Sequence, residues 1–129
     1  MLAGFFQVLF MFYLINRFGI TQNNPLLFLY LSLSLSPILA GVFNPLKFSR
    51  THFILSAYYF SFLPCLMLVF GHFIYNSEKL LAFLSIIFGL VYILGESAII
   101  FYHKNISNTP LEVYSFLMLS FWIMAITFM

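Results

Sequence analysis

Long apolar runs alternate with short polar breaks along the whole chain. The breaks are rich in proline, glycine, asparagine and the few charges, and they separate five apolar runs of 17 to 24 residues. At about 1.5 Å of helix rise per residue, runs of this length match the roughly 30 Å hydrocarbon core of a bilayer. The pattern therefore predicts five transmembrane helices, at residues 2–18, 26–43, 52–75, 80–102 and 113–129.

One segment departs from the helical pattern. Residues 31–36 alternate leucine with serine, which is the period of a β-strand. The alternation lies inside a longer apolar run, and serine in a membrane helix can bond to its own backbone or to a neighbouring helix. We therefore expect a helix here. A β-barrel is not predicted, because its strands need alternating polarity over about 10 residues each.

The composition excludes several classes of protein. Of the 129 residues, 64% are hydrophobic and only 6% are charged, whereas a soluble domain carries about 25% charged residues. Such a chain is not expected to be water-soluble, and it lacks the dense basic surface of a nucleic-acid binder. We predict an all-α polytopic integral membrane protein. Residues 1–129 form one transmembrane domain, a bundle of five helices with short loops.

The basic residues indicate an orientation. With five spans, Lys47, Arg50 and Lys104 fall on one side of the membrane, and Arg17 and Lys79 fall on the other. Cytoplasmic loops carry an excess of Lys and Arg, so this distribution favours an inside N-terminus by one charge.

Two short segments bear on localisation. The glycosylation sequon at residues 105–107 faces inward in this orientation, so we expect it to be unmodified. Met1 is followed at once by Leu2 and Ala3, with no basic leader and no polar cleavage region, so we expect no targeting peptide. Both features fit a protein of a bacterial or a mitochondrial inner membrane.

Glu96 is the one carboxyl deep within a predicted span. A charge at the bilayer centre costs at least about 2.5–3.5 kcal/mol, so this group should face protein or water, or carry a proton. Tyr92, Gly89 and Ser85 precede it by four, seven and eleven residues, and His103 follows it by seven. These residues form a small and polar stripe, which should face another helix.

Depth in the membrane predicts which groups can meet Glu96. It lies six residues, or about 9 Å, from the nearer end of its span. Each of the other four spans has a polar side chain at a similar depth, with Tyr58 or Tyr59 on the third. The candidate intramembrane polar cluster consists of Glu96, Tyr92, Tyr59, Ser36, Gln7 and Ser120. The simpler alternative is that Glu96 is neutral, or bonded to one hydroxyl, and only joins two helices.

No catalytic, metal or cofactor site is predicted. His52, His72 and His103 do not share a depth well inside the membrane, as two haem ligands would, and we expect them at the headgroup level. Cys65 and His72 lie about 10 Å apart along one helix axis, too far for a nucleophile and its base.

These features favour an accessory or structural subunit of a larger multi-protein membrane complex. An energy-transducing complex of the respiratory type is the natural candidate by analogy of fold, because such assemblies contain small helical subunits with a lone intramembrane glutamate. The expected partners are the lipid bilayer and other transmembrane subunits, with no nucleic acid. One alternative is a small proton- or ion-coupled transporter or channel that uses Glu96. A second is a membrane-embedded enzyme or an immunity-type protein.

Overall fold

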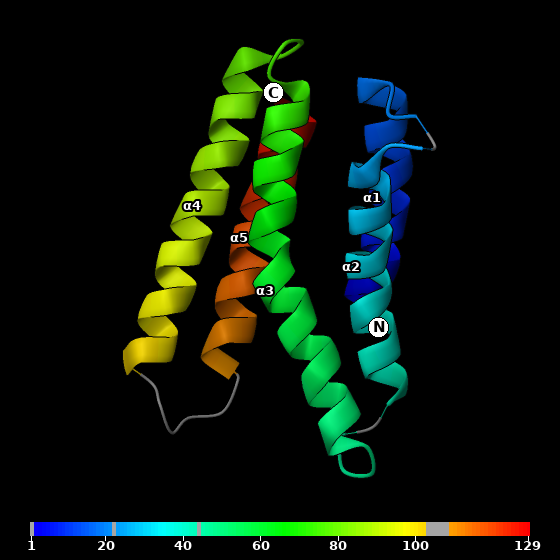
Figure 1. Ribbon diagram of the computed structural model, residues 1–129, viewed down its shortest axis with the longest axis vertical. Helices are drawn as coiled ribbons and strands as arrows, with labels where there is room; N and C mark the ends of the chain where they lie inside the picture. The colour runs from blue at the N-terminus through cyan, green and yellow to red at the C-terminus, as the bar shows by residue number, and fades with distance from the viewer. Residues whose placement is uncertain (1, 22, 44, 103–108) are drawn as a thin grey trace. The chain divides into compact units, whose positions relative to one another are not determined.

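The computed structural model describes residues 2–21, 23–43, 45–102 and 109–129 (Figure 1). Within these residues the chain forms five α-helices and no strand, which confirms the predicted all-α class. The helices are α1 (Leu2–Phe18), α2 (Pro25–Val42), α3 (Ser49–Ile74), α4 (Lys79–Tyr102) and α5 (Thr109–Phe128).

Among the described residues, four helices are long and apolar enough to cross a membrane: α2, α3, α4 and the part of α5 from Pro110 onward. The helix α1 is apolar but shorter, with 17 residues. Two helices begin three or four residues earlier than hydropathy predicts: α3 at Ser49 instead of residue 52, and α5 at Thr109 instead of residue 113. Their first turns are polar, and hydropathy alone does not detect a helical turn that extends beyond the hydrocarbon.

The chain divides into two compact units, and the boundary lies inside α3. Unit 1 is residues 1–63, with α1, α2 and the first part of α3; unit 2 is residues 64–129, with the rest of α3, α4 and α5. Pro64, the first residue of unit 2, has no N–H to bond the carbonyl four residues earlier, so α3 lacks one helical hydrogen bond there. A single transmembrane domain over the whole chain stays a prediction.

The connection between α1 and α2 follows from three residues. Gly19 has a φ of +62°, the left-handed conformation that commonly ends a helix. The side chain of Asn24 accepts a hydrogen bond from the backbone N–H of Leu26 at 2.9 Å and caps α2. Pro25 begins α2, where its missing N–H has no partner to lose. The helix α2 therefore begins one residue before the predicted span at residues 26–43.

In unit 1, α1 and α2 pack side by side (Figure 1). Gly4 allows the close approach, because a Cβ built on it would lie 2.5 Å from the backbone oxygen of Ser34. Small residues at helix interfaces serve this purpose in membranes. Leu14, Leu33 and Leu63 are almost fully buried in this unit.

In unit 2, α4 and α5 pack together around large aromatic side chains. Trp122 of α5 is fully buried, and its ring meets that of Phe70 edge to face at 5.4 Å between centroids. Two glycines bring α3 and α4 together. A Cβ on Gly71 would lie 2.8 Å from the backbone oxygen of Ala82, and one on Gly89 would lie 2.8 Å from the Leu68 side chain.

Candidate functional site

The alternating serines of α2 form two kinds of hydrogen bond, one kind to α3 and the other within α2. Ser32 and Ser36 are one helical turn apart: Ser32 Oγ lies 2.8 Å from Tyr58 Oη, and Ser36 Oγ donates to the backbone oxygen of Leu55 at 2.6 Å. Ser34 donates to the carbonyl of Tyr30 in its own helix at 2.9 Å. The expected helix over this segment is confirmed, and Ser32 and Ser36 join α2 to α3.

His52 adds a further bond at the same interface. Its Nδ1 lies 2.9 Å from the carbonyl oxygen of Ala40 and 3.2 Å from that of Phe43. Both groups can only accept, so Nδ1 carries the hydrogen. The last carbonyls of a helix lack partners within the helix, and His52 therefore closes the end of α2. The α2–α3 ladder, as we call it, consists of the bonds of Ser32, Ser36 and His52.

Two of the predicted cluster residues meet in unit 1. Gln7 Nε2 of α1 donates a hydrogen bond to Tyr59 Oη of α3, and both side chains are buried. Ser36, the third predicted residue of this unit, bonds the α3 backbone instead. Tyr30 was not predicted: its buried hydroxyl interacts electrostatically with Tyr59 but has no hydrogen-bond partner among the described residues. Its place inside a span, away from the aromatic belt, was the signal in the sequence.

The polar stripe of α4 faces other helices of unit 2, as predicted. Tyr92 Oη donates to Ser115 Oγ at 2.5 Å, and Trp122 Nε1 donates to Ser85 Oγ at 3.0 Å. Gly89, between Ser85 and Tyr92 on the stripe, packs against α3. Within the residues that the structure describes, the stripe is confirmed from Ser85 to Tyr92; His103 lies outside them.

Glu96 lies where this packing ends. No residue of α4 beyond Tyr92 is buried up to its end at Tyr102, and Glu96 is itself partly exposed. The nearby Tyr114 of α5 interacts electrostatically with Glu96, but its hydroxyl donates to the backbone oxygen of Val91 at 2.7 Å. No hydrogen bond or ion pair joins Glu96 to another described residue.

Within unit 2, α5 does not bring Ser120 to Glu96. The bonds of Tyr92 and Trp122 fix the antiparallel register of α4 and α5, and this register sets Ser120 level with Ile87. That position is nine residues, or about 14 Å, along α4 from Glu96. Ser120 is also exposed. Depth counted from the helix ends missed this, because side-chain bonds set the register of the pair. The predicted cluster of six is therefore wrong for Ser120, and the part of it that joins Gln7, Ser36 and Tyr59 to Glu96 stays a prediction.

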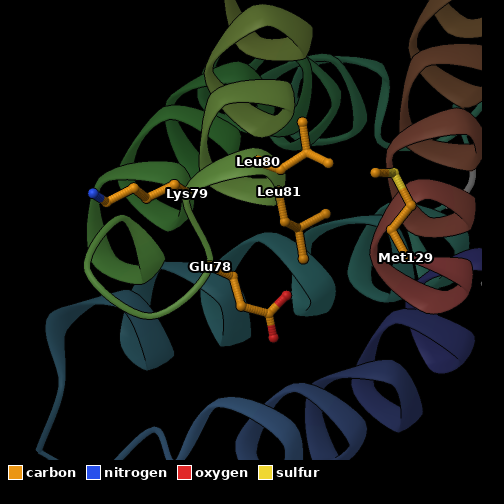
Figure 2. A pocket seen from close by; sticks show the side chains of 5 residues that line it. All are labelled: Glu78, Lys79, Leu80, Leu81 and Met129. Carbon is orange, nitrogen blue, oxygen red and sulfur yellow. The ribbon is translucent and has the colours of Figure 1, made fainter.

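A small pocket lies at the α3–α4 turn (Figure 2). Its volume is about 200 Å³, and its lining is Glu78, Lys79, Leu80, Leu81 and Met129. The Lys79 side chain extends away from the other four (Figure 2). The lining has no nucleophile beside a base. In the described part of the chain, no three His, Cys, Asp or Glu side chains are placed to hold a metal ion.

Comparison of the chain with protein-family models, with curated proteins and with solved structures gave no match. The candidate site therefore rests on the residues themselves. It consists of Glu96, the adjacent Tyr114 and the end of the α4 stripe. In chemical terms it offers a carboxyl group that can accept a hydrogen bond or hold a proton.

Proposed function

We propose that this chain is a small accessory subunit of a larger membrane-protein complex, and that Glu96 contacts the neighbouring subunit. The observation that carries the proposal is a partly exposed carboxyl on an apolar helix with no hydrogen bond to any described residue. In hydrocarbon such a group is costly unless protein or water receives it, at about 2.5–3.5 kcal/mol on insertion scales. A donor on a second transmembrane chain would remove that cost.

Tyr114 does not supply the hydrogen-bond donor that Glu96 lacks. Its ring lies against Gly95, and its one hydroxyl hydrogen is already used by the carbonyl of Val91. An ionised Glu96 therefore cannot receive that hydrogen without breaking the bond to Val91. The partner that we propose brings a hydroxyl, amide or cationic side chain to α4 at this level.

The surface of the helices supports a subunit role. Only 17% of the most apolar stretch of α4 is buried inside the chain, and the corresponding value for α3 is 39%. Most of α4 is therefore available to lipid or to other helices. Large exposed side chains follow one face of it, among them Phe83, Leu90 and Leu94, which are seven and four residues apart. Flexible apolar and aromatic surfaces pack well against irregular partners.

The kind of complex is inferred by analogy of fold. Energy-transducing complexes of the respiratory type contain small helical subunits with a lone intramembrane glutamate, so we favour that class. The same reasoning favours a bacterial or a mitochondrial inner membrane.

The native mass of the particle tests the proposal. The chain is released from its own membrane with a mild detergent and resolved on a native gel, as wild type and as Glu96→Leu. We expect the wild type in a stoichiometric assembly of several proteins, and Glu96→Leu shifted to free chain. Glu112→Gln, which removes a carboxylate from the first turn of α5, is the matched control and should stay assembled. A wild-type chain that runs alone or as a small homo-oligomer would refute the subunit role.

The same carboxyl also favours a second candidate, a proton- or ion-coupled transporter or channel. A carboxyl inside a membrane span is a common element of proton and ion pathways. Purified chain in vesicles would then carry protons or a cation by itself, and Glu96→Gln would abolish the flux. Flux by the isolated wild-type chain would favour this candidate over the subunit.

A further inference from the structure

The connection between α2 and α3 presents two cations beside large apolar side chains. We call residues 45–50 the α2–α3 turn. Lys47 and Arg50 are both exposed. Between and beside them, Leu46 is 92% exposed and Phe48 is 50% exposed. An exposed leucine at a turn between two membrane-spanning helices lies where the hydrocarbon meets the headgroups.

The turn is held in shape from within. The rings of Phe43 and Phe48 meet edge to face at 5.6 Å between centroids. The N–H of Phe43 bonds the carbonyl of Leu39 at 2.9 Å, and its carbonyl accepts from His52 Nδ1. Phe43 and His52, which lie on either side of the turn, are therefore held together, and a ligand that binds the turn has less backbone to order.

The cations of the turn have no carboxylate in their unit. Residues 1–77 contain three basic residues and neither Asp nor Glu. The third cation, Arg17, is engaged near the end of α1. It donates to the hydroxyl of Tyr13 at 2.8 Å, and it lies 5.0 Å from the centroid of the Phe18 ring. Within unit 1, Lys47 and Arg50 can be neutralised only by an anion from outside the unit.

We propose that the α2–α3 turn is a binding site for anionic phospholipid. Lys47 and Arg50 contact the phosphate headgroup, and the side chains of Leu46 and Phe48 lie among the first carbons of the acyl chains. Basic side chains beside a membrane span are attracted to anionic lipid. A free anion would gain nothing from the two apolar side chains, so the lipid is the ligand that matches all four residues. The site would place this turn at an anionic leaflet, whatever protein meets Glu96.

Native mass spectrometry of the detergent-solubilised chain tests the site. The chain is titrated with phosphatidylglycerol or with phosphatidylcholine, as wild type and as the double variant Lys47→Gln/Arg50→Gln. We expect the double variant to bind phosphatidylglycerol at least tenfold more weakly, because each cation near an anionic surface favours binding by about fivefold. Binding of phosphatidylcholine should be weak and equal in both chains.

The matched control loses the same charge elsewhere. Arg17→Gln/Lys79→Gln also removes two cations and should bind phosphatidylglycerol like the wild type. The charge-conserving variant Lys47→Arg/Arg50→Lys should bind it too. Full binding by Lys47→Gln/Arg50→Gln would overturn the proposal, as would an equal loss in the control.

Two measurements on the wild type remain decisive if the double variant does not fold. Affinity for phosphatidylglycerol should fall when salt rises from about 0.05 to 0.5 M, because salt screens exposed charges. Unchanged affinity would overturn the proposal. Inorganic phosphate should displace no more lipid than sodium chloride of equal ionic strength. Stronger displacement by phosphate would identify a site for a free anion and would also overturn the lipid site.

Discussion

The two units of this chain hold their helices together by different means. In unit 1 the interface between α2 and α3 is a ladder of hydrogen bonds that join Ser32, Ser36 and His52 to the facing helix. In unit 2 the interior is built around large aromatic rings, with Trp122 fully buried. Lipid is as apolar as leucine, so helices in a membrane associate by close packing and by hydrogen bonds rather than by the hydrophobic effect. Hydrogen bonds and close packing contribute to both units, but the α2–α3 interface of unit 1 is mainly hydrogen-bonded, whereas large buried aromatic rings fill unit 2.

The difference also separates structural polar groups from candidate functional ones. Among the fully buried side-chain polar atoms that the structure describes in unit 1, the hydroxyl of Tyr30 is the one without a hydrogen-bond partner. Unit 2 contains all three glutamates of the chain, and Glu96 is the one that lies well inside a membrane-length helix. A polar group that is hydrogen-bonded within its own unit needs no partner outside that unit. Glu96 has no hydrogen bond to a described residue, so we propose a partner on another protein.

Removal of Trp122 should have the largest effect on stability. Trp122→Ala leaves a cavity in unit 2 and deprives Ser85 of its donor, so we expect a loss of about 3–5 kcal/mol in the free energy of unfolding. Unfolding in mixed micelles, followed by circular dichroism, measures it. Phe121→Ala, at an exposed neighbouring position, should cost far less. Equal losses would show that unit 2 does not depend on this packing.

A side chain at Gly71 should have the next largest effect. Gly71→Val places a Cβ against the backbone of Ala82, which cannot move aside as a side-chain tip would. We expect a loss of about 1–3 kcal/mol, the usual cost of overpacking, in the same unfolding experiment. Gly19→Ala is the control. It strains the backbone because Gly19 has a positive φ, but the new Cβ would meet no atom within 4 Å. Its effect should therefore remain local to the end of α1. A stable Gly71→Val would contradict the close approach of α3 and α4.

Removal of a bonded and of an unbonded polar group in unit 1 should change the free energy of unfolding differently. Gln7→Leu leaves Tyr59 without its bond and should cost about 1 kcal/mol. Tyr30→Phe removes a hydroxyl that has no partner, so it should leave stability unchanged or raise it slightly. Thermal unfolding of both variants side by side gives the comparison. A clear loss in Tyr30→Phe would show that the Tyr30 hydroxyl is bonded.

Single rungs of the α2–α3 ladder should have the smallest effects. Ser32→Ala and Ser36→Ala should each cost about 0.6 kcal/mol, the average for hydrogen bonds between membrane helices. Ser34→Ala, whose bond stays within α2, is the control and should cost less than either. A Ser34→Ala variant that loses the most would mean that the ladder contributes little to the packing of α2 on α3.

The sequence predicted the helices better than their contacts. Hydrophobic run length defines a membrane helix almost completely, so all five helices were predicted. The stripe from Ser85 to Tyr92 was also predictable, because helical spacing puts its members on one face. The relation of Ser120 to Glu96 was not, since it depends on the register of α4 and α5. That register follows from the bonds of Tyr92 and Trp122, which residue spacing within one helix does not contain.

The hydrogen bonds of the predicted cluster residues in unit 1 were predictable only in part. Depth placed Gln7 and Tyr59 at one level, and they do bond. Depth also selected Ser36, whose hydroxyl instead bonds a backbone carbonyl of α3. Backbone acceptors occur at every level of every helix, so counting polar side chains cannot anticipate such a choice. The same limit applies to His52, whose two acceptors are main-chain oxygens.

The most direct test of the central claim, that another protein covers Glu96, is site-specific photo-crosslinking in the native membrane. A benzophenone side chain replaces Ile100, an exposed residue one helical turn beyond Glu96. In a parallel sample it replaces Phe83, which is also exposed and lies about 20 Å from Glu96 along α4. After irradiation, we expect position 100 to yield one dominant adduct with a different protein, and we expect Glu96→Leu to abolish that adduct. Crosslinks to lipid alone at position 100, with no protein adduct, would contradict the claim.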